Sequence, residues 1–134
     1  MITAVDTHVL LDVFLSSERH GEQSRTRLAD AYDAGAIIIC DLVYAELVPA
    51  FPDRSSFDDA LRRIGVRVSS IKSSIAFEAG LRWKQYRSSG GPRTRIITDF
   101  LIGTHAVAEA NVFLTRDRGF FSSYFPELED ADAR

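Results

Sequence analysis

Short apolar runs alternate along the chain with segments that have the apolar spacing of a helix. Ile2–Val5 is such a run, and apolar residues then recur every three or four positions over residues 9–14, as in an amphipathic helix. A second helix is predicted over residues 20–35, because Gly35 is a typical helix terminator. The bulky, uncharged run AIIIC at 36–40 is typical of a strand that is buried on both faces.

The rest of the chain continues this alternation. Residues 41–51 have helical spacing again, with Asp41 in the N-cap position and Pro49 near the end. Further helices are predicted over 52–63, from Ser73 or Ser74 through Tyr86, and up to Asn111. Short strands are predicted over 112–115 and, as an edge strand or extended loop, over 66–71, whereas SSGGPRTR at 88–95 is a loop. The alternation predicts an α/β fold with a parallel sheet.

Composition narrows the class of protein only moderately. A chain of 134 residues with 46% hydrophobic and 26% charged residues is expected to form one domain over 1–134. The segment 126–134 is an acidic C-terminal tail, and the body before it has 15 acidic and 15 basic residues. The single cysteine, Cys40, is expected to be buried and reduced, and neither a signal peptide nor a membrane-spanning run is visible. We therefore expect a cytoplasmic protein with no membrane partner.

Acidic residues recur where predicted strands end. Asp6 follows the run ITAV, Asp99 follows RIIT and Asp117 follows VFLT. Because the carboxyl ends of parallel strands meet at one edge of a sheet, Asp6 and Asp117 are expected to converge there, and Asp99, at a helix N-terminus, can reach the same edge. Glu46 is a fourth candidate, since its neighbours along the helix are apolar and a charge on such a stripe needs a partner.

Four converging carboxylates would resist ionising together unless a cation lies among them. No Lys or Arg is clearly aimed at these acids, and clustered carboxylate oxygens suit Mg²⁺ or Mn²⁺ better than zinc. The acids therefore predict a hard-metal site. Each also has a purely structural interpretation, in which Asp6 and Asp99 are helix N-caps, Asp117 is a turn residue and Glu46 is a solvated helix acid.

A basic stretch precedes Asp99. Residues 79–98 contain five basic residues and, up to Thr98, no acid: Arg82, Lys84, Arg87, Arg93 and Arg95. Trp83 and Tyr86 lie among them, and aromatic rings with basic side chains and a glycine loop suit single-stranded nucleic acid. The structural alternative is a solvated helix face with Trp83 in the core.

Four segments together resemble a known family. VDTHVLLD, YAEL, TDFLIGTHA and LTRDRGFF, in this order and spacing, resemble the PIN-domain ribonucleases, and the short single-domain form resembles the VapC toxins of type II toxin-antitoxin modules. The resemblance extends from Ile2 to about Phe125. It implies a three-layer α/β/α PIN-like fold with a short central parallel sheet. It also implies Mg²⁺- or Mn²⁺-dependent endonucleolytic cleavage of an RNA substrate. It also implies inhibition by a cognate antitoxin protein and a homodimer.

The resemblance also assigns roles to individual residues. The family's acids match Asp6, Glu46, Asp99 and Asp117 as metal ligands or as groups that orient the attacking water, and its hydroxyl residue matches Thr115. Charge and position make four arginines candidates for holding RNA: Arg93, Arg95, Arg116 and Arg118. His8 stands where many members have a small polar residue. We expect it to pack against the protein, the alternative being contact with the substrate or with a water beside the metal, and we expect His105 to be structural.

Several other functions remain open or are disfavoured. A non-catalytic RNA-binding module of PIN-like fold and a DNA nuclease of the same fold are both compatible with the residues. A haloacid dehalogenase-like phosphatase is disfavoured because His8 occupies the place of its second Asp, and a receiver domain because Arg116 and Arg118 replace its Lys. An antitoxin helix is expected to bind an apolar groove near four residues: Leu28, Tyr32, Tyr44 and Phe51.

Overall fold

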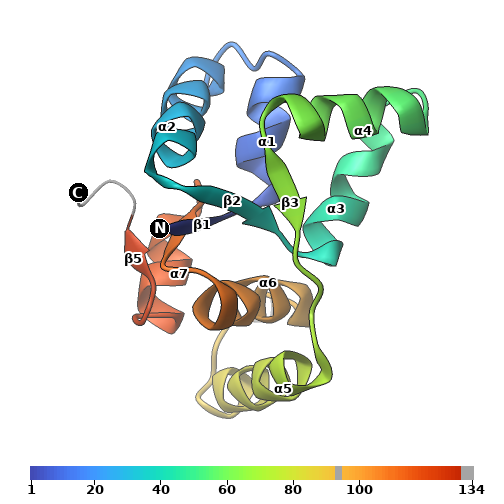
Figure 1. Cartoon of the computed structure of the whole chain (residues 1–134). Coiled ribbons are helices and arrows are strands. Elements are labelled where there is room, and N and C mark those ends of the chain that lie inside the picture. The colour runs from blue at the N-terminus through green and yellow to red at the C-terminus, as the bar shows by residue number, and fades with distance from the viewer. Residues whose placement is uncertain (93–94, 131–134) are drawn as a thin grey trace.

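A parallel sheet lies in the middle of the protein, between two layers of helices (Figure 1). The structure is a computed structural model that describes residues 1–92 and 95–130. Within these residues the sheet has five strands in the order β3-β2-β1-β4-β5, and all neighbouring strands are parallel. The strands are β1 (Ile2–Val5), β2 (Ala36–Ile39), β3 (Val66–Val68), β4 (Val112–Leu114) and β5 (Glu129–Asp130).

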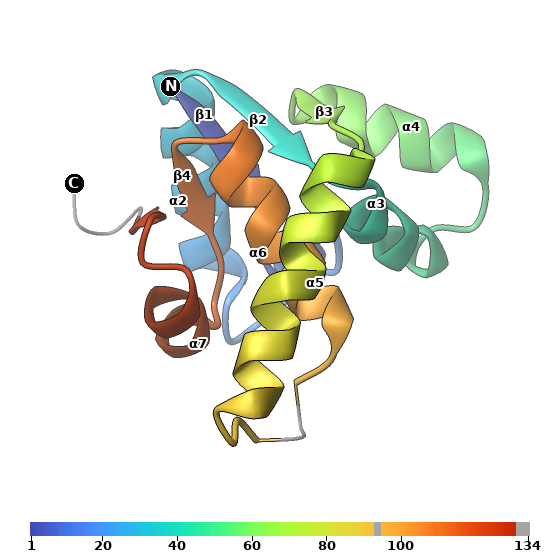
Figure 2. The same ribbon diagram turned by 90° about the horizontal axis from the view of Figure 1, so that it is seen from below.

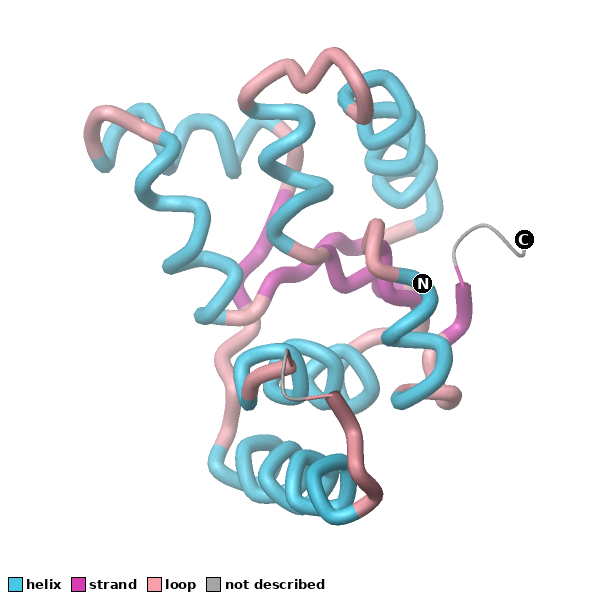
Figure 3. Tube along the Cα trace, turned by 180° about the vertical axis from the view of Figure 1, so that it is seen from behind, coloured by secondary structure: helices cyan, strands magenta, loops and turns pink. Residues whose placement is uncertain are grey.

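The helices divide between the two faces of the sheet. They are α1 (Thr7–Phe14), α2 (Gly21–Ala34), α3 (Asp41–Leu47), α4 (Arg54–Arg63), α5 (Ser73–Ser88), α6 (Ile97–Glu109) and α7 (Arg118–Tyr124), and a single 3₁₀ turn, Val48–Ala50, follows α3. Helices α1, α2 and α4 lie on one side, and α5, α6 and α7 lie on the other (Figures 1 and 3). Helix α5 forms the outer surface over α6 (Figure 2). The predicted three-layer α/β/α class, a PIN-like fold with a short central parallel sheet, is confirmed.

Burial explains why the strands are short and apolar. Every side chain of β4 is buried, as are Ile37, Ile38 and Ile39 of β2, because helices cover both faces of the sheet. Strand β3 is an edge strand, as predicted, and its Val68 is exposed. On the α5 side an aromatic cluster fills the space between the helices, and its members are Tyr86, Phe100, Phe120, Phe121 and Phe125.

Two predicted helix caps and one predicted strand were wrong. The N-cap of α3 is Cys40 and that of α5 is Lys72, so neither Asp41 nor Ser73 or Ser74 is the N-cap of its helix. Residues 96–98 form no strand, because α6 already begins at Ile97 and Asp99 lies in its first turn. Within the predicted acidic tail, residues 126–134, β5 pairs with β4. Residues 131–134 of the predicted tail lie outside the described residues.

The strand order creates a crevice between β1 and β4. The chain leaves β1 toward α1 on one face, whereas it leaves β4 toward α7 on the other (Figure 1). Ligands of open α/β sheets bind outside the carboxyl ends of the strands at such a switch point. Among the described residues, no helix is long and apolar enough to cross a membrane.

Candidate active site at the ends of β1 and β4

Asp6 stands at the switch point and connects β1 to α1. Its backbone amide donates to the carbonyl of Leu114 at 2.9 Å, so β4 fixes its position. It is the N-cap of α1, and its Oδ1 accepts a hydrogen bond from the Thr7 amide at 2.8 Å. The N-cap interpretation is therefore correct, but it accounts for only one of the two carboxylate oxygens.

The other Asp6 oxygen belongs to a link with β4. Thr115 directly follows β4 and is buried, and its hydroxyl donates to Asp6 Oδ2 at 2.8 Å. The same hydroxyl oxygen accepts from the backbone amide of Asp117 at 3.0 Å. Thr115 therefore holds Asp6 and the Asp117 loop in a fixed relation, as its place two residues before Asp117 suggests.

Glu46 joins this network through a residue that sequence reasoning missed. The Thr7 hydroxyl donates to Glu46 Oε1 at 2.8 Å, so Thr7 contacts Asp6 through its amide and Glu46 through its side chain. Thr7 is buried at the first position of α1. The only signal in the sequence was a hydroxyl residue directly after the capping acid.

The electrostatics of Asp6 favour a cation beside it. Burial is the largest influence and raises the pKa of the Asp6 carboxyl above its ordinary value. The hydrogen bonds from Thr115 and Thr7 lower that pKa, and the negative charge of Glu46 raises it. Asp6 therefore carries a desolvated charge whose hydrogen-bond donors are neutral.

Asp117 binds a protein cation that the sequence did not reveal. An Arg95 guanidinium nitrogen lies 2.5 Å from Asp117 Oδ2, and the Arg95 guanidinium also lies 4.1 Å from the centroid of the Phe120 ring. The hydrogen bond with Asp117 is the main influence that raises the pKa of Arg95, and the charge of Asp99 raises it further. The expectation that no Arg is aimed at the acids was wrong for Asp117.

The structure thus brings some of the predicted site residues together and leaves one apart. Asp6, Glu46, Thr115 and Asp117 form one hydrogen-bonded network. Asp99 lies in the first turn of α6, where its Oδ2 is 3.4 Å from the Ile96 amide, and it lies within electrostatic reach of Arg95. Among the contacts of the described residues, Asp99 is linked to this network through the charge of Arg95.

A hollow of about 380 Å³ opens beside this network. Its lining comprises Asp6, His8, Arg116 and Asp117. His8 is exposed and its charge lowers the pKa of Asp6, so the expectation that His8 packs against the protein was wrong. His105, in contrast, is fully buried in α6, as expected for a structural residue.

Arg116 has an acidic partner that sequence reasoning also missed. Its Nε lies 3.0 Å from Asp12 Oδ2, and the same oxygen accepts from the Ser24 hydroxyl at 2.8 Å. Asp12 is buried, so the Arg116 charge offsets the cost of placing a carboxylate between α1 and α2. This contact ties the loop after β4 to the helices of the opposite layer.

The basic stretch divides into two groups. Arg82 does not face the site, because it pairs with Glu127 and Glu78 and lies over the Phe125 ring. Lys84, Arg87 and Arg95 line a separate hollow, which is connected to the acids through the pair of Arg95 and Asp117. Among the other predicted RNA-binding residues, Arg118 is the first residue of α7 and is exposed, and Arg93 lies outside the described residues.

The donor chemistry of the network fits a hard divalent cation. Within residues 1–92 and 95–130, no three His, Cys, Asp or Glu side chains stand close enough to hold a metal ion in this conformation. The available donors are nevertheless carboxylate oxygens, which Mg²⁺ and Mn²⁺ prefer. Asp6 and Glu46 converge on Thr7, and Asp117 already binds a cation in the form of Arg95.

Comparison with known proteins identifies the family. The family model of the PIN domain matches residues 3–125, so the chain belongs to the PIN domain family, a family of nucleases. A comparison with curated protein sequences gave no significant match. The matched region includes the whole network from Asp6 to Asp117.

Solved structures share the fold over almost the whole chain. One is VapBC2 from Rickettsia felis bound to a DNA fragment from its promoter, with 20% identity and a TM-score of 0.73 over 97% of this chain and 98% of that chain. Another is VapBC-1 from nontypeable Haemophilus influenzae, with 19% identity and a TM-score of 0.68 over 97% of this chain and 96% of that chain.

Proposed function

We propose that the protein is a VapC-type toxin, an endoribonuclease that uses Mg²⁺ or Mn²⁺ to cleave RNA. The observation that carries the proposal is the placement of Asp6 at the switch point, linked through Thr7 to Glu46 and through Thr115 to the Asp117 loop. Membership of the PIN domain family supports the nuclease activity. The fold shared with two VapBC structures supports the toxin assignment.

Asp6, Glu46, Asp99 and Asp117 would hold the metal in this proposal. A bound Mg²⁺ or Mn²⁺ would lower the pKa of a coordinated water and offset charge on the leaving oxygen. The Thr115 hydroxyl holds Asp6 next to the Asp117 loop, and the Thr7 hydroxyl holds Glu46 next to Asp6. Glu46 is more exposed than Asp6 and suits the orientation of the attacking water.

Basic residues near the acids would hold the RNA backbone. Arg95 pairs with Asp117 and Arg116 pairs with Asp12, and each arginine lines one of the two hollows, where its guanidinium group would meet a phosphate. Arg118 and Arg93 complete the proposed set. The alternatives are a non-catalytic RNA-binding module and a DNA nuclease of the same fold.

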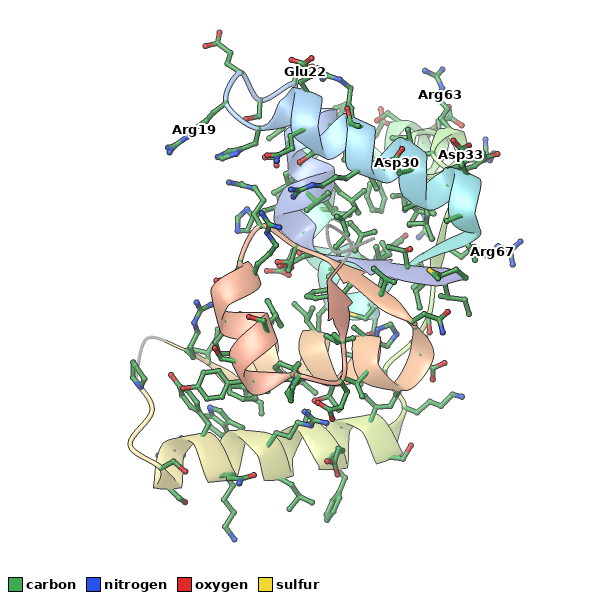
Figure 4. All side chains as sticks on the ribbon, turned by 90° about the vertical axis from the view of Figure 1, so that its left-hand side faces the viewer. Arg19, Glu22, Asp30, Asp33, Arg63 and Arg67 are labelled. Carbon is green, nitrogen blue, oxygen red and sulfur yellow. The ribbon has the colours of Figure 1, made fainter. Side chains whose placement is uncertain are left out.

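A cleavage assay separates these possibilities. Purified protein free of antitoxin is incubated with total RNA and, separately, with single-stranded DNA in Mn²⁺, in Mg²⁺ and in EDTA. Asp6→Asn should reduce RNA cleavage by at least about 100-fold, because it removes a proposed metal ligand, and loss of a group that only orients a ligand already costs about 10- to 100-fold. Asp30→Asn, on the exposed face of α2 and labelled in Figure 4, is the matched control and should cleave normally.

The outcomes discriminate between the three functions. Millimolar Mn²⁺ should raise the melting temperature of the wild type and not that of Asp6→Asn, because a ligand that binds only the folded state stabilises it. Metal stabilisation with cleavage of DNA alone would indicate the DNA nuclease. RNA binding without cleavage or metal stabilisation would indicate the non-catalytic module.

We further propose that an antitoxin segment binds between α1, α2 and α4. A groove of about 400 Å³ there has an apolar lining of Val13, Leu28, Tyr32 and Ile64. Asp33 and Arg63 lie at its border (Figure 4), where a peptide backbone or charged side chain would meet them.

Only part of the predicted antitoxin surface coincides with this groove. Leu28 and Tyr32 line it, whereas Tyr44 and Phe51 pack on Phe57 with ring centroids at 4.9 and 5.1 Å. When the protein is coexpressed with a candidate antitoxin from the neighbouring reading frame, Tyr32→Ser should weaken co-purification and Tyr124→Ser, on α7, should not. Equal recovery with both variants would contradict the groove. The family resemblance extends the proposal to a homodimer, which light scattering on the purified protein would test.

A further inference from the structure

A second hollow has a volume of about 870 Å³. The end of α5 and the described residues of the loop before α6 line it, among them Trp83, Lys84, Tyr86, Arg87, Gly91 and Arg95. Arg95 connects this hollow to the acid network, because it lines the hollow and also pairs with Asp117, which lines the acid hollow. A ligand of the second hollow would therefore lie next to the acids.

The aromatic part of the lining is arranged for stacking. The Arg87 guanidinium lies 4.9 Å from the centroid of the Trp83 ring, a cation-π pair that offers a flat surface. Trp83 is half-buried and packs against the core, so its ring is held in place beside the hollow that it lines.

The loop that closes the hollow is held against Tyr86. The Tyr86 hydroxyl donates to the carbonyl of Pro92 at 2.6 Å. A Cβ atom on Gly91 would lie only 2.5 Å from the Tyr86 ring, so this approach of the loop requires glycine. The hydrogen bond of Tyr86 with Pro92 and the close approach of Gly91 to Tyr86 therefore fix this side of the hollow.

The charge of the lining selects an anionic occupant. Among the described residues that line the hollow, Lys84, Arg87 and Arg95 are basic and none is acidic. A flat, hydrogen-bonding ring that carries phosphate matches a stacking surface with a basic rim. We infer that this hollow is a nucleobase subsite, which stacks an unpaired base that flanks the scissile phosphate on Trp83. The inference rests on the proposed ribonuclease function, and it adds that the protein binds a base of the RNA next to the cleaved phosphate.

Trp83 itself reports on occupancy, because it is the only tryptophan in the chain. The wild-type protein in EDTA, which prevents cleavage, is titrated with AMP, GMP, CMP, UMP and ribose 5-phosphate while tryptophan fluorescence is recorded. At least one nucleotide should quench the fluorescence to saturation and bind at least about ten-fold more tightly than ribose 5-phosphate, since stacking needs the base. Equal binding of ribose 5-phosphate, or no saturable quenching, would overturn the inference.

Two variants separate the hollow from general charge effects. Arg87→Gln removes the cation over Trp83 and should weaken nucleotide binding about five-fold or more. Arg67→Gln removes an exposed arginine from β3, at the edge of the sheet in Figure 4, and should leave binding unchanged. Equal losses in both variants would show that the quenching reflects unspecific charge and would contradict the subsite.

A cleavage readout completes the test and distinguishes the two proposals. Removing the base next to a mapped cleavage site, by an abasic substitution in a short RNA, should slow cleavage about ten-fold. Cleavage of RNA without any base-dependent quenching would refute the subsite and leave the nuclease intact. Base-dependent quenching in a protein that cleaves no RNA would support the hollow as a base site and refute the nuclease.

Discussion

Thr115→Val tests whether one buried hydroxyl holds the acid network together. The substitution keeps the shape of the side chain and removes the donor to Asp6 and the acceptor of the Asp117 amide. A hydrogen bond to a charged group contributes about 1.5–3 kcal/mol and one between neutral groups about 0.5–1.5 kcal/mol. The added methyl group returns about 0.8 kcal/mol of apolar burial, so we expect a net loss of roughly 2 kcal/mol.

This loss is measurable. The unfolding entropy of a chain of 134 residues makes 2 kcal/mol equivalent to a fall of about 7 °C in melting temperature. Urea denaturation in EDTA gives the free energy directly and keeps metal binding out of the comparison. RNA cleavage should fall about 10- to 100-fold, because Thr115 orients groups that the reaction uses.

The chain offers a matched control and a rescue. Thr104 is equally buried in α6, but within the described residues its hydroxyl has no hydrogen-bond partner, so Thr104→Val should leave stability unchanged or raise it. Thr115→Ser keeps the hydroxyl and should retain most of the cleavage activity. If Thr115→Val were no less stable than Thr104→Val, the link from Asp6 to the Asp117 loop would be refuted.

Two further predictions concern the packing of α6. Burial lowers the pKa of His105 below 6.5, the ordinary value for histidine. As the pH falls below 6.5, the unfolded chain therefore takes up a proton on this residue before the folded protein does, so the free energy of unfolding should decline. In thermal unfolding at a series of pH values, His105→Gln should show a smaller decline than the wild type. Gly103→Ala should lower the free energy of unfolding by about 1–3 kcal/mol, because the new Cβ would lie 2.5 Å from the Phe125 ring. Ala106→Gly is the control, because it changes a buried residue of the same helix without adding an atom that could clash. If Gly103→Ala lowered the free energy of unfolding less than Ala106→Gly does, the clash with Phe125 would be contradicted.

The fold was predictable wherever burial determines side-chain type. Buried strands require apolar runs, and helices packed on one face require apolar spacing, so β1, β2, β4 and most helices follow from the pattern. Strand β5 was missed because its residues, Glu129 and Asp130, have no apolar signal, and it joins the sheet through backbone pairing with β4. Residues 96–98 were misassigned because a short apolar run at a helix start resembles a strand.

The candidate site was predictable to the extent that topology alone places it. Asp6, Thr115 and Asp117 follow strands that lie side by side, so their convergence required only the strand order. The contacts of Thr7, Arg95 and Arg116 depend on how loops and helix ends fold back, which no periodicity encodes.

Arg95 changes the electrostatic argument for a metal without removing it. The sequence argument assumed that no protein cation meets the acids, yet Arg95 offsets the charge of Asp117. This pair is substantially exposed, with 29% and 42% of the two side chains accessible, and exposed pairs contribute at most about 1 kcal/mol. A divalent cation that displaces Arg95 from Asp117 would therefore bind roughly five-fold more weakly than it would without this pair. The hydrogen-bond donors to the Asp6 carboxylate are neutral, and its described contacts include no ion pair like that of Asp117. The charge of His8 lowers the pKa of Asp6, but burial outweighs it, so a metal cation at the end of β1 would still stabilise the Asp6 carboxylate.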